Sequence, residues 1–206
     1  MTTLLVFAKA PVAGAVKTRL AATVGPERAL AVYRALLDTT LACADAARAA
    51  GVVRRVELWG TPEGDATALD VLSARHGFTR HAQQGADLGA RMAHALAATL
   101  QGAPRALLAG TDCPVLTPEY LALAAAALDA HDAVLGPAED GGYVLVGARR
   151  PVTFAGVRWS TPHACADTRA AFAAQHATCA LLPPLWDVDD AAGLARWQHL
   201  AEGAGA

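Results

Sequence analysis

Short apolar runs alternate along the chain with longer segments whose apolar residues recur at helical spacing. Residues 4–8 and 106–110 are nearly uninterrupted apolar runs, which is typical of strands buried on both faces of a sheet. A long helix is predicted between them, with Pro26 in its first turn and Gly51 after its last. Its apolar positions are Leu30, Tyr33, Leu37, Leu41 and Ala44. The first strand is expected to lie inside the sheet.

The rest of the chain continues this alternation. Further strands are predicted at residues 52–59, 78–83, 133–136, 143–146 and 180–182. Further helices are predicted from a loop at 61–64 to His76, over 87–100, from Thr117, from Thr161, and from an Asp190 cap through Trp197. Because crossovers rather than two-residue hairpins join these elements, we predict an α/β protein with three α/β/α layers and a mostly parallel, mixed sheet. Such sheets bind ligands at the carboxyl ends of their strands.

Composition narrows the class of protein. A length of 206 residues favours one domain spanning residues 1–206. No apolar stretch reaches the roughly 20 residues that cross a bilayer, and the N-terminus lacks the basic region of a signal peptide, so we expect a cytoplasmic protein without membrane contact. A net charge of −2 without a basic stripe disfavours a nucleic-acid partner. Four cysteines without a CxxC pair indicate free thiols rather than a zinc or disulfide site.

The loop after the first strand is the first candidate for chemistry. Lys9, Lys17 and Arg19 can neutralise a diphosphate there, and Gly14 lets the backbone turn close to a ligand. The loop matches neither the Walker A motif nor the GxGxxG dinucleotide-binding motif. Val16 stands where the Walker A motif needs glycine, and the GxGxxG pattern is absent. A solvated basic loop is the alternative interpretation.

Two carboxylates follow predicted strands. Asp112 comes after Thr111 at the end of a buried run, where one or two carboxylates and phosphate oxygens would hold Mg²⁺ or Mn²⁺. The alternative is that Asp112 only caps a turn before Pro114. Asp140 lies in an acidic turn whose two glycines, Gly141 and Gly142, permit a sharp bend or a close approach to a ligand. We expect both carboxylates on the same rim of the sheet.

Two weaker candidates remain. Asp187 and Asp189 alternate near the C-terminus and would face one side, so that Asp189 is expected to reach the same metal. Gln84 and Gly85 are free to meet a base or ribose, whereas Asp87 is better explained as a helix N-cap.

Taken in order, these motifs resemble a family of bacterial proteins known as arsenosugar-biosynthesis-type glycosyltransferases. The likeness spans nearly the whole chain. The segments that carry it are residues 7–11, Gly14, residues 16–20, 87–89, 91–92, 110–114, 140–143 and 159–161. More distantly, the chain resembles phospholactate guanylyltransferase and the molybdenum-cofactor nucleotidyltransferases. The resemblance implies the GT-A fold of nucleotide-diphospho-sugar transferases, with a nucleotide-binding half and an acceptor-binding half.

The resemblance also assigns roles to residues. Asp112 corresponds to the metal-binding carboxylate of a DxD motif, and Asp140, Asp112 and Lys17 are the candidate catalytic residues. The nucleotide-binding residues are predicted to be Ala8, Lys9, Ala10, Pro11, Gly14, Lys17, Arg19, Gln84, Gly85, Asp87, Leu88 and Thr111. The acceptor-binding residues are predicted to be Gly141, Gly142, Tyr143, Trp159, Ser160 and Thr161. Residues 190–193 depart from the family pattern, which weakens the assignment of the C-terminal acidic segment.

The leading functional hypothesis is a transferase that moves a sugar from a nucleotide-diphosphate sugar to a small acceptor with Mg²⁺ or Mn²⁺. Nucleotidyl transfer with release of pyrophosphate is the first alternative, because the same loop, metal and carboxylates would serve it. A nucleotide-binding module without turnover is the second. The sequence leaves the base, sugar, acceptor and oligomeric state open.

Overall fold

A computed structural model describes residues 1–61 and 67–203. Within that part of the chain, seven strands form one sheet, in the order β3-β2-β1-β4-β6-β5-β7. The strands are β1 (Thr2–Ala8), β2 (Arg55–Gly60), β3 (Thr79–Ala82), β4 (Arg105–Ala109), β5 (Ala133–Pro137), β6 (Tyr143–Ala148) and β7 (Cys179–Leu181). Only β6 runs antiparallel to its neighbours among these strands. The predicted mixed, mostly parallel sheet is confirmed.

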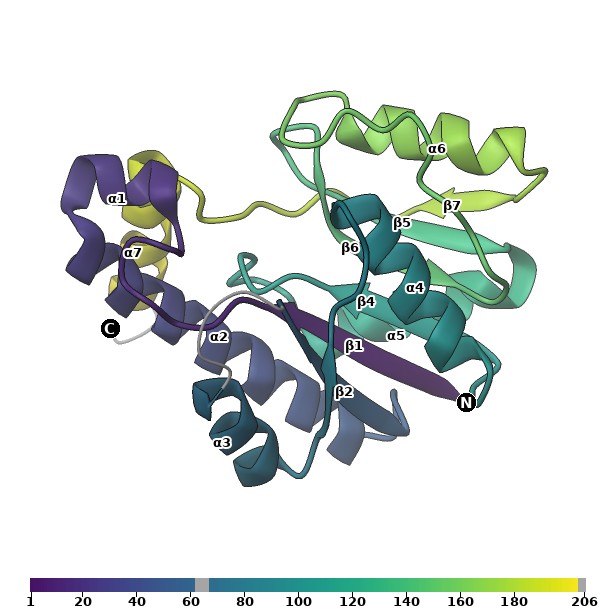
Figure 1. The fold of residues 1–206 in the computed structure, drawn as a ribbon, viewed down its shortest axis with the longest axis horizontal. Coiled ribbons are helices and arrows are strands. Elements are labelled where there is room, and N and C mark those ends of the chain that lie inside the picture. Colours follow the sequence, from purple (N-terminus) through teal and green to yellow (C-terminus); the bar gives the residue numbers. More distant parts are fainter. Residues whose placement is uncertain (62–66, 204–206) are drawn as a thin grey trace.

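Helices cover both faces of this sheet (Figure 1). They are α1 (Thr18–Val24), α2 (Pro26–Ala49), α3 (Thr67–His76), α4 (Leu88–Leu100), α5 (Pro118–Ala130), α6 (Ala164–Ala174) and α7 (Ala191–Gly203). Alternate residues of β1 face opposite layers: Leu4 and Val6 join the core formed with α2, α3 and α5, whereas Leu5 and Phe7 join the core formed with α4 and α6. The three-layer prediction is therefore confirmed. No helix in the described ranges has the length and apolarity to cross a membrane.

The structure moves several predicted boundaries. The strand predicted from residue 52 begins at Arg55, because the N–H groups of Val52 and Val53 donate to the Ala47 carbonyl at the end of α2. The α6 helix begins at Ala164 rather than at Thr161, and α7 runs beyond Trp197 to Gly203. Most of the loop predicted at residues 61–64 lies outside the described residues.

Two features were not predicted. Residues 18–24 form α1, a short helix whose N-cap, Lys17, makes no side-chain cap hydrogen bond. The chain also turns back after β5 through residues 138–142, instead of crossing over, and so reverses β6. Because β5 runs parallel to β4, the acidic turn that follows it lies at the same edge of the sheet as the carboxyl end of β4.

A third apolar cluster lies beyond the carboxyl edge of the sheet. It joins α1, the start of α2 and α7, and contains Leu20, Ala29, Leu36, Trp186, Val188 and Leu194. Figure 1 shows α1 and α7 side by side, although they come from opposite ends of the chain. This packing brings the first loop and residues 187–189 together.

Candidate active site at the carboxyl edge of the sheet

A cleft of about 860 Å³ opens at the carboxyl ends of β1 and β4. Its volume lies in the range of small-molecule sites, roughly 300–1,000 Å³. The predicted residues that line it are Ala8, Lys9, Lys17, Arg19, Leu88, Thr111, Asp112, Asp140, Gly142, Tyr143, Trp159, Ser160, Thr161 and Asp189. The structure thus gathers residues from both predicted halves around one opening.

An ion-pair cluster lies at the centre of the cleft. The ammonium group of Lys17 contacts Oδ1 of Asp112 and lies 3.0 Å from Oδ1 of Asp189. The Lys17 side chain is only 4% exposed, whereas both carboxylates are nearly half exposed. The backbone of Lys17 is left-handed, with φ 49° and ψ 46°, an uncommon conformation for a residue other than glycine. Strain of this kind clusters at functional sites.

Backbone contacts hold the two carboxylate segments against each other. The N–H of Val188 donates to the carbonyl of Asp112 at 2.9 Å. Val188 is fully buried in the third cluster together with Leu20, three residues after Lys17. The three charged groups are therefore positioned by apolar packing on both sides.

The fourth carboxylate of the cleft, Asp187, is partly buried. Burial raises its pKa to about 6, and the charges of Asp189, Asp140 and Asp112 add to the increase, while Lys17 opposes it. Asp187 was considered for this site from the sequence but not assigned a role. Burial is thus the main cause of the raised pKa, and repulsion from the other three carboxylates of the cleft adds to it.

The Asp187→Asn variant is expected to be more stable than the wild type at neutral pH. Because the folded pKa is raised above 3.8, ionising Asp187 costs stability, and this cost grows as pH rises from about 4 through about 6. We expect a gain of about 1–2 kcal/mol at pH 7.5 that vanishes near pH 4. Urea unfolding with EDTA at both pH values measures it. An equal difference at both values would contradict the expectation.

The donor set fits a hard divalent cation. Asp112 and Asp189 each direct one carboxylate oxygen toward the position that the Lys17 ammonium group occupies. Within the described ranges, no group of three or more histidine, cysteine or acidic residues has the spacing of a complete metal site. A cation here would be completed by water and by phosphate oxygens, which is how Mg²⁺ is usually held.

The cleft is also lined by two polar residues that the sequence analysis did not single out. The Tyr33 hydroxyl accepts from the N–H of Lys9 at 2.8 Å and donates to the Lys9 carbonyl at 2.9 Å. Burial raises the pKa of Tyr33 to about 12, so the phenol stays neutral. Gln83 donates to the carbonyl of Trp59. Tyr33 resembled an ordinary apolar helix position in the sequence, so no local signal indicated its contact with the loop.

Seven predicted site residues do not line the cleft: Ala10, Pro11, Gly14, Gln84, Gly85, Asp87 and Gly141. Ala10 is buried, and Asp87 caps α4 by accepting from the N–H of Ala90 at 2.8 Å. Gly85 packs against the backbone of Arg91, which leaves no room for a side chain. Their assigned binding roles stay predictions.

The acidic turn is held by close backbone contacts. Oδ1 of Asp140 accepts from the N–H of Gly142 at 2.8 Å, and the Gly141 carbonyl accepts from the N–H of Cys165 at 3.0 Å. Gly141 has φ +89°, and a Cβ there would lie 2.1 Å from the carbonyl oxygen of Pro162. Only glycine permits this approach.

Gly141→Ala is expected to destabilise the protein by at least about 2 kcal/mol, because it adds a backbone clash to an unfavourable φ. Gly156→Ala is the matched control, since Gly156 has φ +77° but open space around its Cα. That variant should lose only about 1 kcal/mol. Chemical unfolding of both variants measures the difference, and equal losses would show that the contact with Pro162 is unimportant.

Comparison with known proteins defines the family. No curated protein matches the chain in sequence. A family model described as "Uncharacterized protein conserved in bacteria (DUF2064)" matches residues 40–161, more than half of the chain. The chain belongs to this family.

Solved structures place the DUF2064 chain among nucleotide-diphospho-sugar transferase folds. A crystal structure from Desulfovibrio desulfuricans G20, provisionally described as a nucleotide-diphospho-sugar transferase, is 34% identical, with a TM-score of 0.79 over 92% of this chain and 82% of that one. CMP:2-keto-3-deoxy-manno-octonic acid synthetase complexed with CTP is 11% identical, with a TM-score of 0.61 over 98% and 99%. The Mycobacterium tuberculosis glucosyl-3-phosphoglycerate synthase, in complex with Mn²⁺, UDP and phosphoglyceric acid, is 9% identical, with a TM-score of 0.54 over 89% and 69%.

The latter two similarities show the fold alone. Together, the comparisons support a transferase of the nucleotide-diphospho-sugar superfamily. They do not show the arsenosugar-biosynthesis type of glycosyltransferase that the resemblance implied.

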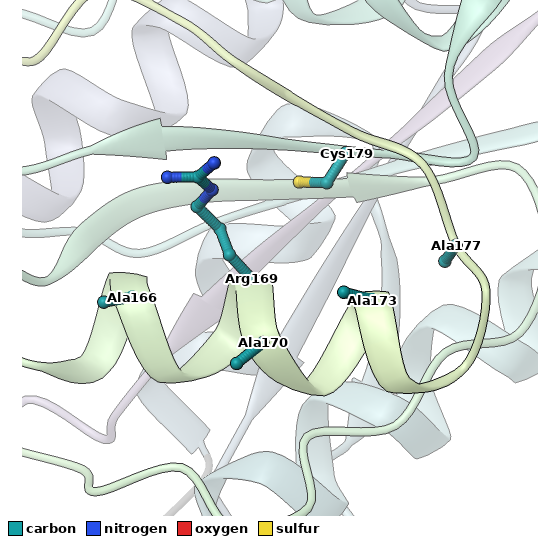
Figure 2. Close-up of a pocket in the computed structure, with 6 residues that line it drawn as sticks. All are labelled: Ala166, Arg169, Ala170, Ala173, Ala177 and Cys179. Atoms are coloured by element: carbon teal, nitrogen blue, oxygen red, sulfur yellow. The ribbon is translucent and has the colours of Figure 1, made fainter.

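A second hollow of the DUF2064 protein, about 410 Å³, lies between α6 and β7. Figure 2 shows that alanines form most of its wall and that Arg169 and Cys179 point into it. None of the predicted site residues lines it, and it contains no carboxylate. All four cysteines are free, and burial raises the pKa of Cys179 and that of Cys113 to about 11, which disfavours a nucleophilic thiolate at either position.

Proposed function

We propose that this protein is a single-domain, divalent-metal-dependent glycosyltransferase that takes a sugar from a nucleotide-diphosphate sugar. The observation that carries the proposal is the Lys17 ammonium group between Asp112 and Asp189, at the strand ends of a cleft large enough for such a donor. The arsenosugar-biosynthesis type remains a proposal that rests on the sequence resemblance.

The residues of the cleft would have separate roles in such a reaction. Lys9, Lys17 and Arg19 would neutralise the diphosphate, which gains negative charge as the sugar leaves. Asp112 and Asp189 would hold the Mg²⁺ or Mn²⁺ ion, which supplies further charge stabilisation to the departing diphosphate. Asp140 also lines the cleft and would orient or deprotonate the acceptor hydroxyl.

Thermal unfolding with a panel of ligands tests the proposal. UDP-, GDP-, ADP-, CDP- and dTDP-sugars and the matching triphosphates are added with and without Mn²⁺ to the wild type and to Asp112→Ala. A ligand at 100 times its Kd should add about 2.7 kcal/mol of stability. We expect one nucleotide sugar to stabilise the wild type when Mn²⁺ is present and not when it is absent. This stabilisation should be lost in Asp112→Ala.

The released product separates the candidate reactions. Glycosyl transfer releases a nucleoside diphosphate, whereas nucleotidyl transfer consumes a triphosphate and releases pyrophosphate. Release of pyrophosphate would indicate that the reaction is nucleotidyl transfer and not glycosyl transfer. Metal-independent binding that survives Asp112→Ala without turnover would indicate a binding module, and no binding at all would refute the nucleotide site.

A further inference from the structure

The segments that form the cleft differ in the charges that they contribute to its lining. The cations Lys9, Lys17, Arg19 and Arg91 come from the first loop, α1 and α4. The lining residues contributed by segments 140–146 and 159–164 include no lysine, arginine or histidine. Positive charge among the described lining residues therefore comes from the first loop, α1 and α4, and not from these two segments.

The nearest cation of the acceptor segments is already paired. The Arg158 guanidinium donates to both carboxylate oxygens of Asp167, at 2.8 and 2.9 Å. This two-pronged geometry holds the guanidinium away from other anions. Arg158 does not line the cleft.

The start of α6 also offers little to an anion, although helix N-termini commonly bind them. The N–H of Ala164 donates to the carbonyl of Thr161 at 3.2 Å, and the N–H of Cys165 donates to the carbonyl of Gly141 at 3.0 Å. Pro162 has no N–H, and Asp167 places a negative charge in the first turn. The N–H groups of Ala164 and Cys165 are thus already used.

The same side of the cleft instead presents an aromatic wall beside carboxylates. The ring of Trp159 lies edge-on to that of Tyr143, with 6.3 Å between centroids, and is braced by Phe154 at 6.1 Å. Burial raises the pKa of Tyr143, so its phenol carries no charge. Asp140 and Asp187 line the same cleft. An aromatic face next to hydroxyl-binding carboxylates suits sugars and other alcohols with an apolar face.

Building on the proposed glycosyl transfer, we infer that the acceptor is an electrically neutral sugar or alcohol with an apolar face, and not a phosphorylated or carboxylated molecule. An anionic acceptor would meet Asp140, Asp187 and the donor diphosphate, and segments 140–146 and 159–164 add no cationic side chain to the described lining. The inference disfavours nucleotidyl transfer to an acceptor phosphate at this site.

Binding of a matched pair of probes tests the inference without the natural acceptor. The full-length protein is first saturated with Mn²⁺ and the nucleoside diphosphate that stabilises it most. Phenyl β-glucoside and phenyl phosphate are then titrated by calorimetry. We expect the neutral glucoside to bind at least about tenfold more tightly than the anionic phosphate. The Asp140→Asn variant keeps a side-chain oxygen that can accept the hydrogen bond of the turn, but it loses the negative charge. The ratio between the affinities for the glucoside and for the phosphate should therefore decrease.

Two variants at one position examine the aromatic wall. Trp159→Ala should abolish glucoside binding while nucleotide binding persists, and Trp159→Phe should restore part of it. Phenyl phosphate binding as tightly as the glucoside, or a glucoside that fails to bind the nucleotide-loaded wild type, would overturn the inference. Failure of every nucleotide to bind would instead contradict the proposed function, so the two failures are distinguishable.

Discussion

Asp112→Asn is expected to lower kcat for nucleoside diphosphate release by at least about 100-fold, because one charged ligand to the proposed metal becomes a neutral amide. The exchange preserves size at a half-exposed side chain, and the carbonyl that accepts from Val188 stays in place. Stability should therefore change little. The concentration of Mn²⁺ needed for half-maximal rate should also rise, and steady-state assays over a range of Mn²⁺ measure both effects.

Asp38→Asn is the matched control for this variant. Asp38 is an exposed carboxylate on α2 that does not line the cleft, so its replacement changes the net charge equally. Its rate and Mn²⁺ dependence should match the wild type. If Asp112→Asn retained the wild-type Mn²⁺ dependence, Asp112 would not be a metal ligand.

Lys17→Met is expected to act in opposite directions on two ligands. The affinity for the nucleotide sugar should fall at least about tenfold, because a cation facing the diphosphate is lost. The affinity of the nucleotide-free protein for Mn²⁺ should rise, since Lys17 no longer neutralises Asp112 and Asp189. The variant should also be less stable without Mn²⁺ and should recover with it, because two facing carboxylates are left unpaired. Calorimetric titration and thermal unfolding measure these effects.

Lys9→Met distinguishes this explanation from a general loss of positive charge. Lys9 lines the same cleft but is exposed and does not bridge the two carboxylates. It should weaken nucleotide binding without strengthening Mn²⁺ binding. A gain in Mn²⁺ affinity of the same size in both variants would show that net charge, and not the bridge, controls the metal.

The predictions for Lys17 follow from one exchange, in which the cation replaces the Lys17 ammonium group between the two carboxylates. Lys17 occupies the space between the carboxylates that the cation would need. Diphosphate oxygens would attract the ammonium group and supply ligands to the cation together. Metal and nucleotide are therefore expected to bind cooperatively, each increasing the affinity for the other.

Local patterns were sufficient for much of the fold. The apolar runs of β1 and β4 are buried on both faces, so they stand out without knowledge of their neighbours. The helix caps Asp87, Thr117 and Asp190 each accept from a backbone N–H three residues later, an interaction confined to one turn. Asp112 could be placed at a rim because parallel strands present their carboxyl ends together.

What the sequence by itself determined is thus most of the elements, though not α1, together with the layer architecture and the position of the first strand-end carboxylate, since each depends on residues close together in the chain. Only the tertiary structure decided that Lys17 meets Asp189, 172 residues away, and that Tyr33 holds the loop at Lys9. The reversal of β6 was likewise invisible, because its apolar pattern is the same in either direction. Packing of α1 against α7 created the charged centre of the cleft, and such long-range contacts leave no periodic trace in the sequence.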